Sequence, residues 1–283
     1  MASVINLKRR IKTAKNITKL TRALEMVAVS KLRRGKEGAL KARPYADKLF
    51  FITSSLKRID QEEAHPFFLK KEGGKILYIV FSPDRALCGA LISNLTREFF
   101  SITSGGKTAA LVTVGRKFAQ RIVKTGLTIV ADFPFGTSFP AFDTVLQIRS
   151  LIVDEFLRKE VSEVFCLYTK FENVFSQKPQ MIKLLPIEFP SVAQKENLPY
   201  LFEPDATDVL TSLLPHYLEM QLFQMFIESY ASEQASRMNS MHNATENAKE
   251  VVEVLTLEYN KVRQERVTNE ILDIVTASMS IGL

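Results

Sequence analysis

The sequence predicts an α/β protein in which two long helical ends flank a central, doubly wound domain with a mostly parallel sheet. Three observations support this fold class: the placement of glycine and proline, the alternation of strands and helices in the middle, and the charge difference between the ends. Of the 11 glycines and 11 prolines, 21 lie between Gly35 and Pro215. The expected domains are an N-terminal helix over 1–60, an α/β domain with linkers over 61–204, and C-terminal helices over 205–283.

The N-terminal end is expected to form one long helix, because its first 34 residues hold neither glycine nor proline. Apolar residues at spacings of three and four predict two stripes on this helix. They are Ile17, Leu20, Leu24 and Val27, followed by Tyr45, Leu49, Ile52, Leu56 and Ile59. Gly35, Gly38 and Pro44 lie between the stripes, and a bend is expected near Pro44.

The middle of the chain alternates between short apolar runs and amphipathic segments. This alternation predicts a mostly parallel sheet with helices between its strands. The expected strands are 75–81, 109–114, 127–133 and 163–168, with an edge strand over 180–186. Three helices are expected between the strands: one that ends near Ile102, one over 116–124, and one over 143–158 that is capped by Asp143. Residues 191–204 are expected to form a linker.

The C-terminal end holds 66 residues, His216 to Ile281, without glycine or proline. A short helix over about 205–214 is expected to end at Pro215, where the long helix would begin. A heptad seam is predicted on the long helix at Ile227, Tyr230, Gln234, Arg237, Met241, Ala244, Ala248, Val251, Leu255 and Val262. The stretch 235–248 is polar for such a seam, which indicates an exposed functional surface.

The two ends carry opposite charge. Residues 1–58 have a net charge of +13, residues 216–283 have −5, and the part between has −1. Parallel or antiparallel pairing of the ends would therefore lower the electrostatic free energy, although an exposed ion pair contributes only about 0–1 kcal/mol. Composition alone leaves open a dimerising rod and an α/β enzyme with helical arms.

The sequence offers no intact catalytic, cofactor or metal motif. The turn Asp84-Arg-Ala-Leu-Cys-Gly89 after the first strand has one glycine, whereas a dinucleotide site needs GxGxxG. Gly106-Lys107-Thr108 resembles the end of a P-loop, but Ser101 replaces its first glycine and a helix precedes it. The two cysteines are expected to be reduced thiols, and the three histidines lack metal-ligand spacing.

The basic N-terminal helix is compatible with phosphate binding, but no aromatic residue precedes Tyr45 and no nucleic-acid motif is present. Docking on acidic protein surfaces is therefore the better interpretation. No apolar run is long enough to span a membrane. The first 19 residues lack the apolar segment of a secretory signal, although they are amphipathic and basic like a transit peptide.

Three groups of segments resemble the gamma subunit family of F-type ATP synthases, the central rotor of those complexes. The first group is IKTAKNITKLTRALEMVAVSKLRR (11–34) with ARPY (42–45). The second is SPDRALCG (82–89) with SNL (93–95). The third is ASEQASRMNSMHNATENA (231–248), continued by LEYNKVRQ (257–264) and EILDIV (270–275). The segments follow the family order along the whole chain.

The resemblance implies that the two ends form an antiparallel coiled coil standing inside a ring of three alpha and three beta subunits. The chain would couple rotation of the membrane c ring to conformational changes at the catalytic beta subunits, without an active site or cofactor of its own. Its further partner would be the epsilon subunit. The chloroplast regulatory insert is not visible, so a bacterial protein without a transit peptide is expected, peripheral to the cytoplasmic side of the inner membrane.

The resemblance also implies two sets of site residues. The expected partner contacts are Arg9, Arg10, Lys31, Arg33 and Arg34 near the N-terminus, with Arg237, Met238, Asn243 and Glu246 on the C-terminal helix. Alternatively, these cations only pair with the acidic C-terminal helix. The expected bearing tip is Ile274, Val275, Met279 and Ile281, in a segment without charge after Asp273.

Overall fold

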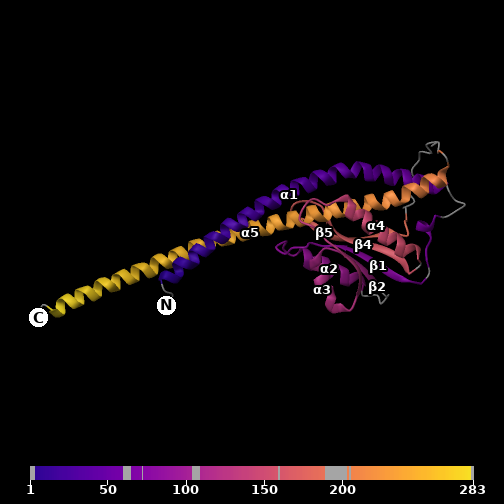
Figure 1. Ribbon diagram of the computed structural model, residues 1–283. Coiled ribbons are helices and arrows are strands. Elements are labelled where there is room, and N and C mark those ends of the chain that lie inside the picture. Colours follow the sequence, from indigo (N-terminus) through magenta and orange to yellow (C-terminus); the bar gives the residue numbers. More distant parts are fainter. Residues whose placement is uncertain are drawn as a thin grey trace. The chain divides into compact units, whose positions relative to one another are not determined.

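A computed structural model describes residues 4–59, 65–71, 73–103, 109–158, 160–188, 203 and 205–281. The predicted P-loop-like segment and, apart from residue 203, the predicted linker lie outside these residues. Two helices dominate the described chain, α1 (Val4–Ile59) and α5 (Ala206–Ile281) (Figure 1). The chain divides into two compact units, residues 1–27 with 238–283 and residues 28–237, and each is described by itself below.

The second unit contains a five-stranded sheet in the order β3-β2-β1-β4-β5. Four strands are parallel: β1 (Lys75–Phe81), β2 (Ala109–Val114), β3 (Thr128–Phe133) and β4 (Val161–Phe171). The fifth, β5 (Gln177–Leu185), pairs antiparallel with β4 at the edge of the sheet. The predicted mostly parallel sheet and its edge strand are therefore confirmed.

Three further helices connect the strands: α2 (Leu91–Thr103), α3 (Arg116–Ile122) and α4 (Phe142–Leu157). Two single turns of 3₁₀-helix, η1 (Pro66–Phe68) and η2 (Val123–Thr125), complete the elements. The predicted Asp143 cap of α4 is wrong. The N-cap position is held by Ala141 without a side-chain hydrogen bond, and Asp143 lies in the first turn, where its charge still complements the helix dipole.

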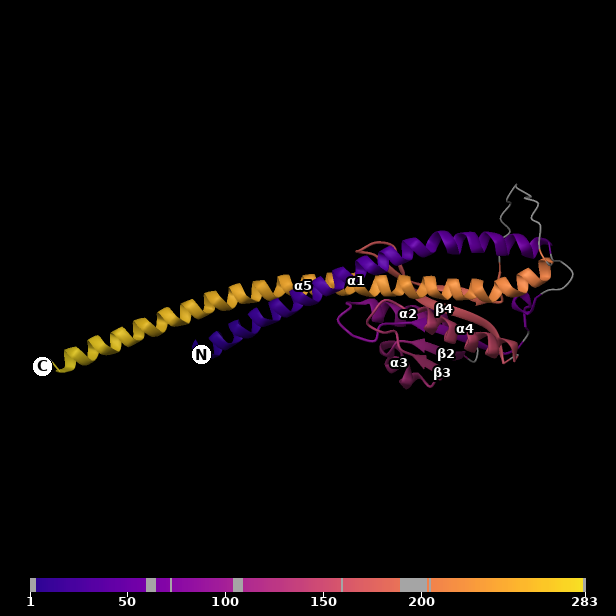
Figure 2. The same ribbon diagram turned by 45° about the horizontal axis from the view of Figure 1, so that its top comes forward.

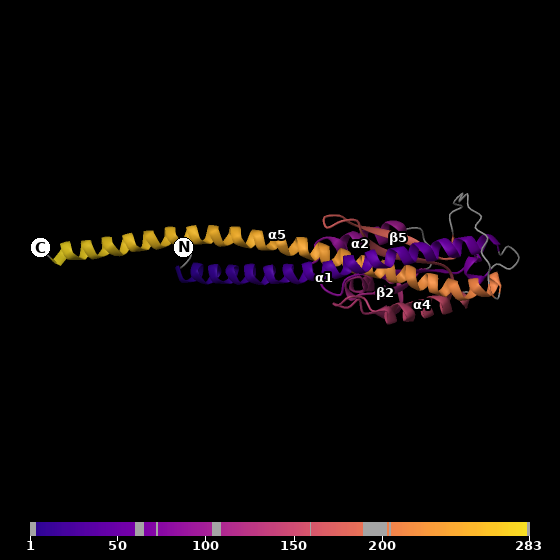
Figure 3. The same cartoon turned by 90° about the horizontal axis from the view of Figure 1, so that it is seen from above.

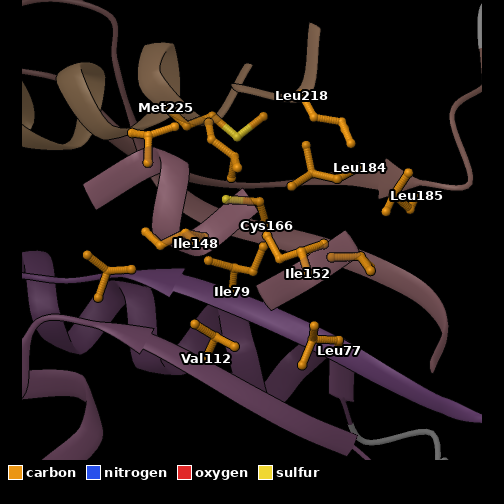
Figure 4. Packing of buried hydrophobic residues seen from close by; sticks show 14 of the residues in the cluster. Leu77, Ile79, Val112, Ile148, Ile152, Cys166, Leu184, Leu185, Leu218 and Met225 are labelled. Carbon is orange, nitrogen blue, oxygen red and sulfur yellow. The ribbon is translucent and has the colours of Figure 1, made fainter. Parts of the chain in front are cut away.

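The sheet buries both faces. Leu77 and Ile79 of β1 and Cys166 of β4 face Ile148 and Ile152 of α4 (Figure 4). Leu218 and Met225 of α5 join the same core, so α4 and α5 cover one face of the sheet (Figure 2). Side chains that alternate with these along the strands, such as Tyr78 and Val80, pack on the opposite face with α2 and α3. The predicted doubly wound arrangement is confirmed.

The prolines do not interrupt the long helices. The expected break at Pro215 is wrong, because α5 continues through it, and α1 likewise continues through Pro44. An interior proline costs a helix about 3 kcal/mol. Burying one leucine contributes roughly 1.5–3 kcal/mol, and four leucines at four-residue spacing offset the cost around Pro215. They are the buried Leu210, Leu214, Leu218 and Leu222.

In the second unit, two glycines of α1 allow close contact with neighbouring side chains. An added Cβ at Gly35 would lie 3.1 Å from the Tyr230 ring and 3.3 Å from the Ala231 side chain, both on α5. At Gly38 it would lie 2.6 Å from the ring of Phe139, which belongs to the loop between β3 and α4. That ring also makes an edge contact with Tyr230. The two glycines therefore admit aromatic rings beside α1.

The first unit is an antiparallel helix pair (Figure 3). Thr21 of α1 accepts a hydrogen bond from Thr245 of α5 at 2.8 Å, and Glu25 contacts His242 at 3.2 Å. The contacted residue number on α5 falls as the number on α1 rises, so the helices run in opposite directions. This pairing confirms the antiparallel coiled coil that the resemblance implied.

The predicted stripes of α1 are mostly wrong. Ile17, Leu20 and Val27 are 48%, 61% and 52% exposed, and Tyr45 and Ile52 are exposed as well, while Leu49 is buried. The side chains of Leu56 and Ile59 lie outside the described residues. Leu24, the remaining member of the first predicted stripe, is half-buried. A heptad row of buried or half-buried positions lies one residue away, at Val4, Leu7, Ile11, Ala14, Thr18, Thr21, Glu25, Ala28, Leu32, Gly35, Ala39, Ala42, Ala46, Leu49 and Thr53. Smaller side chains occupy this seam, so the helices approach closely.

The predicted seam of α5 is correct in part. Its buried members are Ile227, Tyr230, Gln234, Met241 and Leu255, and its half-buried members are Arg237, Ala244, Ala248 and Val262. Val251 is wrong, because it is 49% exposed while Val252 is half-buried. Thr245, rather than Ala244, is the buried residue one turn after Met241.

We expect Gly38→Ala to reveal the contact of α1 with Phe139. Alanine is favoured over glycine in a helix by about 1 kcal/mol, but here the new methyl group displaces the Phe139 ring. The gain in the free energy of unfolding should therefore be well below 1 kcal/mol in the native background. It should return in full when Phe139→Ala is also present. Urea unfolding of the four proteins of this cycle measures the difference, and equal gains in both backgrounds would contradict the contact.

Candidate functional site

The carboxyl edge of a doubly wound sheet is the usual place for a ligand, but here the chain's own side chains fill it. The Asp84 carboxylate accepts hydrogen bonds from the backbone N–H groups of Arg116 at 3.0 Å and Gly136 at 2.8 Å. It therefore occupies the N-terminus of α3, where a phosphate would otherwise find donors. Across the described residues, no group of three or more His, Cys, Asp or Glu side chains is placed to hold a metal ion.

A close backbone approach seals the same edge. The Ser82 hydroxyl accepts a hydrogen bond from the Phe118 N–H at 3.2 Å and donates one to the Gly115 carbonyl at 3.0 Å. Gly115 has φ of 110°, and an added Cβ would lie 1.8 Å from the Ser82 carbonyl oxygen. Only glycine fits this position. This edge of the sheet is therefore closed by contacts within the chain.

The loop after β1 is instead held by α5. Arg237 forms an ion pair with Glu233 at 2.6 Å, and its Nη2 donates to the carbonyls of Arg85 and Ala86 at 3.4 Å. Leu87 has a φ of 68° and is exposed. Burial raises the pKa of Glu233 above its ordinary value, and the Arg237 guanidinium opposes this shift. Arg237 therefore acts inside the chain.

The predicted N-terminal cations in the second unit have different surroundings. Lys31 donates a hydrogen bond to the Thr137 carbonyl, and Arg33 forms an exposed ion pair with Glu37 one turn along α1 at 2.9 Å. Arg34 is exposed. The alternative that these cations only pair with the acidic C-terminal helix does not describe the direct contacts of Lys31 and Arg33, although the charge of Lys31 also favours ionisation of Glu233 on α5. A different cation of α1, Arg43, makes such a pair, at 3.5 Å from Glu228.

In the first unit, several predicted contact residues face outwards. Arg9, Arg10 and Asn243 are exposed, and Met238 is half-buried. Glu246 is exposed and pairs with Lys249 at 2.8 Å. The polar stretch 235–248 is thus mixed, because it also holds buried seam residues.

A polar cluster in this unit was not among the predicted site residues. Glu25 is buried in the seam, where its carboxylate forms an ion pair with Arg22 at 3.0 Å and lies 3.2 Å from Nδ1 of His242. Thr21 and Thr245 hydrogen-bond one turn away. The seven-residue spacing of Leu7, Ala14, Thr21 and Ala28 could have predicted this buried row. The neighbouring stripe is more apolar and was therefore predicted as the buried face instead.

None of the described residues of the first unit covers the last part of α5. Every residue from 263 to 279 is exposed, and the helix extends past the start of α1 (Figure 1). Ile274 and Met279 are 68% and 69% exposed, and Val275 is also exposed, whereas the Ile281 side chain is outside the described residues. Together with Ile17, Leu20 and Val27, these residues present apolar surface of the kind that marks a partner contact. None of the described helices is long and apolar enough to cross a membrane.

Comparison with known proteins identifies close relatives along the whole chain. The family profile for ATP synthase matches residues 3–281. The ATP synthase gamma chain of Dehalococcoides mccartyi is 39% identical over 285 residues, covering 100% of both chains. That of Desulfitobacterium hafniense is 37% identical over 282 residues, covering 99% of this chain and 100% of the relative.

A solved structure shares the fold. A chain in the Euglena gracilis mitochondrial ATP synthase assembly of OSCP, F1 and c-ring superposes with a TM-score of 0.69 at 17% identity. The match covers 98% of this chain and 94% of that one. The long helices and the α/β unit thus occur together in a known protein.

We expect Glu233→Gln to change how stability depends on pH. Because the folded-state pKa of Glu233 is raised, its stabilising contribution is complete below the ordinary glutamate pKa and is lost as pH rises through the raised value. The free energy of unfolding of the variant minus that of the native chain should therefore increase between about pH 4.5 and 7. Urea unfolding at stepped pH measures this difference.

Glu246→Gln is the matched control, since the pKa of Glu246 is lowered, mainly by its hydrogen bond with Lys249. A lowered pKa changes stability mainly below the ordinary glutamate value, so the difference for Glu246→Gln should stay nearly constant between about pH 4.5 and 7. A pH-independent difference for Glu233→Gln would contradict the assignment.

Proposed function

The chain belongs to the ATP synthase gamma chain family, and on that premise we propose that it transmits rotation as a non-catalytic shaft. It is the central rotor subunit of an F-type ATP synthase. The observation that carries the proposal is the exposed end of α5, a 76-residue helix that reaches about 114 Å at 1.5 Å per residue. A lone exposed helix with apolar side chains is suited to enclosure by other subunits.

The proposed mechanism is coupling. One asymmetric shaft inside a ring of three alpha and three beta subunits cannot contact the three beta subunits identically. Each catalytic site is then biased towards a different conformation, and rotation driven by the c ring of a proton-translocating membrane sector exchanges these conformations. Nucleotide chemistry belongs to the beta subunits, which agrees with the filled edge around Asp84.

Exposed residues are the best candidates for contacts with the ring. We assign this role to Arg9, Arg10, Arg34, Asn243 and Glu246, which are exposed, with Arg33 and Met238 beside them. Lys31 and Arg237 are engaged inside the chain, so their proposed part is to hold the loops that carry Thr137 and Arg85.

The shaft would consist of residues 1–60 and 205–283, and residues 61–204 would form the body beside the epsilon subunit and c ring. The complex would place the chain peripherally on the cytoplasmic side of a bacterial inner membrane. The bearing would be Ile274, Val275, Met279 and Ile281, because an apolar tip in an apolar collar has few directional bonds to break at each step.

Co-purification tests the function. The tagged chain, expressed with the alpha, beta and epsilon subunits of its own organism, should elute with all three, and alone it should be a monomer that neither binds nor hydrolyses ATP. Size-exclusion chromatography with an ATPase assay gives both results. A stable homodimer that the other subunits do not recruit would favour the dimerising rod, and ATP hydrolysis by the isolated chain would favour the α/β enzyme with helical arms.

Lysines in the tip test the bearing. Met279→Lys with Ile281→Lys places two charges in an apolar collar, so ATP turnover and rotation rate of the assembled complex should fall several-fold. The matched control is Thr268→Lys with Asn269→Lys, which adds the same charge at exposed polar positions. Unchanged rotation in the tip variant, measured on single molecules, would show that the tip is not a bearing.

A further inference from the structure

One face of α5 is polar where it lies against the α/β body. Ser229, Ser232 and Ser236 follow one another at spacings of three and four residues, so they share a face of the helix. Ser229 and Ser232 are buried, and Ser236 is half-buried. Because polar groups are costly in a helix-to-sheet interface, where apolar side chains would pack without hydrogen-bond requirements, their presence needs a physical reason.

Each serine is bonded to backbone of the body. The Thr169 N–H of β4 donates to the Ser229 hydroxyl at 3.3 Å, and the Ser232 hydroxyl donates to the Thr169 carbonyl at 2.9 Å. One residue of the sheet is therefore held on both its backbone groups. One turn further, the Ser236 hydroxyl donates to the Cys88 carbonyl in the loop after β1 at 2.7 Å.

These hydrogen bonds resist rotation of α5 about its own axis, a motion that apolar packing tolerates. A serine hydroxyl lies about 4.5 Å from the helix axis, so a roll of the helix by about 15° moves it by about 1.2 Å. The three bonds are 2.7–3.3 Å long, and a shift of this size lengthens or bends them well beyond the range of about 2.5–3.2 Å in which hydrogen bonds are strong. Apolar contacts are non-directional and lose little over the same displacement. The serines thus define the rotational setting of α5 on the sheet.

The contacts of α1 with the body differ in kind. Lys31 reaches the Thr137 carbonyl through a flexible side chain, and Phe139 rests its ring against Gly38. Both contacts are made by the ends of movable side chains, and Phe139 is 37% exposed. A roll of α1 is therefore opposed less strongly than a roll of α5.

We propose that Ser229, Ser232 and Ser236 are positioning residues that lock the rotational register of α5 to the α/β body, so that torque applied to the body enters the shaft through α5. This inference rests on the proposed function, because it gives that function its torsional joint. The serines touch no nucleotide and act through the backbone of Thr169 and Cys88.

The test measures torsional stiffness in the assembled complex. A gold nanorod is attached through Asp154→Cys, an exposed position on α4, while both native cysteines are buried. With the alpha–beta ring fixed to a surface and no ATP present, the angular variance of the rod reports the compliance between body and ring. Ser229→Ala with Ser232→Ala should increase this variance at least about twofold over the wild-type complex, since both bonds to Thr169 are lost.

Two controls separate the joint from general effects. Thr211→Val with Ser212→Ala removes two exposed hydroxyls that bond only carbonyls of α5 itself, and should leave the variance unchanged. Ser229→Cys with Ser232→Cys keeps the side chains in place but weakens their hydrogen bonds, and should increase the variance as the alanines do. If the double alanine variant does not assemble, the cysteine variant and Ser236→Ala are measured instead.

An unchanged variance in the serine variants that assemble would overturn the proposal. A wild-type chain that fails to assemble or rotate would instead overturn the proposed function, so the two failures are distinguishable. A change in unfolding midpoint without a change in variance would show that the serines only stabilise the fold.

Discussion

Two long helices remain side by side only if the residues between them repeat in heptads, and this chain keeps that repeat with small side chains. Ala14, Ala28 and Ala39 lie in the buried seam of α1, and larger apolar residues such as Leu20 lie outside it. Small residues let the helix backbones come close, while larger apolar side chains outside the seam remain exposed. The same arrangement therefore joins the two helices and leaves apolar surface on their outer sides.

The sequence was sufficient for the fold but not for the phase of the helices. Strand and helix alternation predicts the sheet, because buried parallel strands have near-continuous apolar runs. The stripe through Ile17 and Leu20 misleads because hydrophobicity normally marks a buried face, whereas this face of α1 is exposed. Pro215 misleads because local helix rules omit the buried leucines around it. The candidate contact residues came from resemblance, and residue patterns alone could not show that Lys31 bonds to Thr137.

The α/β unit uses a ligand-binding architecture for attachment. The donors at the carboxyl edge of its sheet are bonded to Asp84 and Ser82, and the loop carrying Arg85 is held by Arg237 of α5. In other proteins this fold binds nucleotides at the carboxyl edge of the sheet. Here that edge is closed by the chain's own hydrogen bonds and its loop is bonded to α5. The contrast shows why fold alone does not give function.

The uncovered end of α5 also has a consequence for the isolated chain. A solitary helix of the 17 residues from 263 to 279 is only marginally stable in water, since helices of this length depend on packing for most of their stability. In the isolated chain this segment should therefore open more readily than the paired part of α5 and be cut there first by a protease. Whatever covers the segment would order it at the same time.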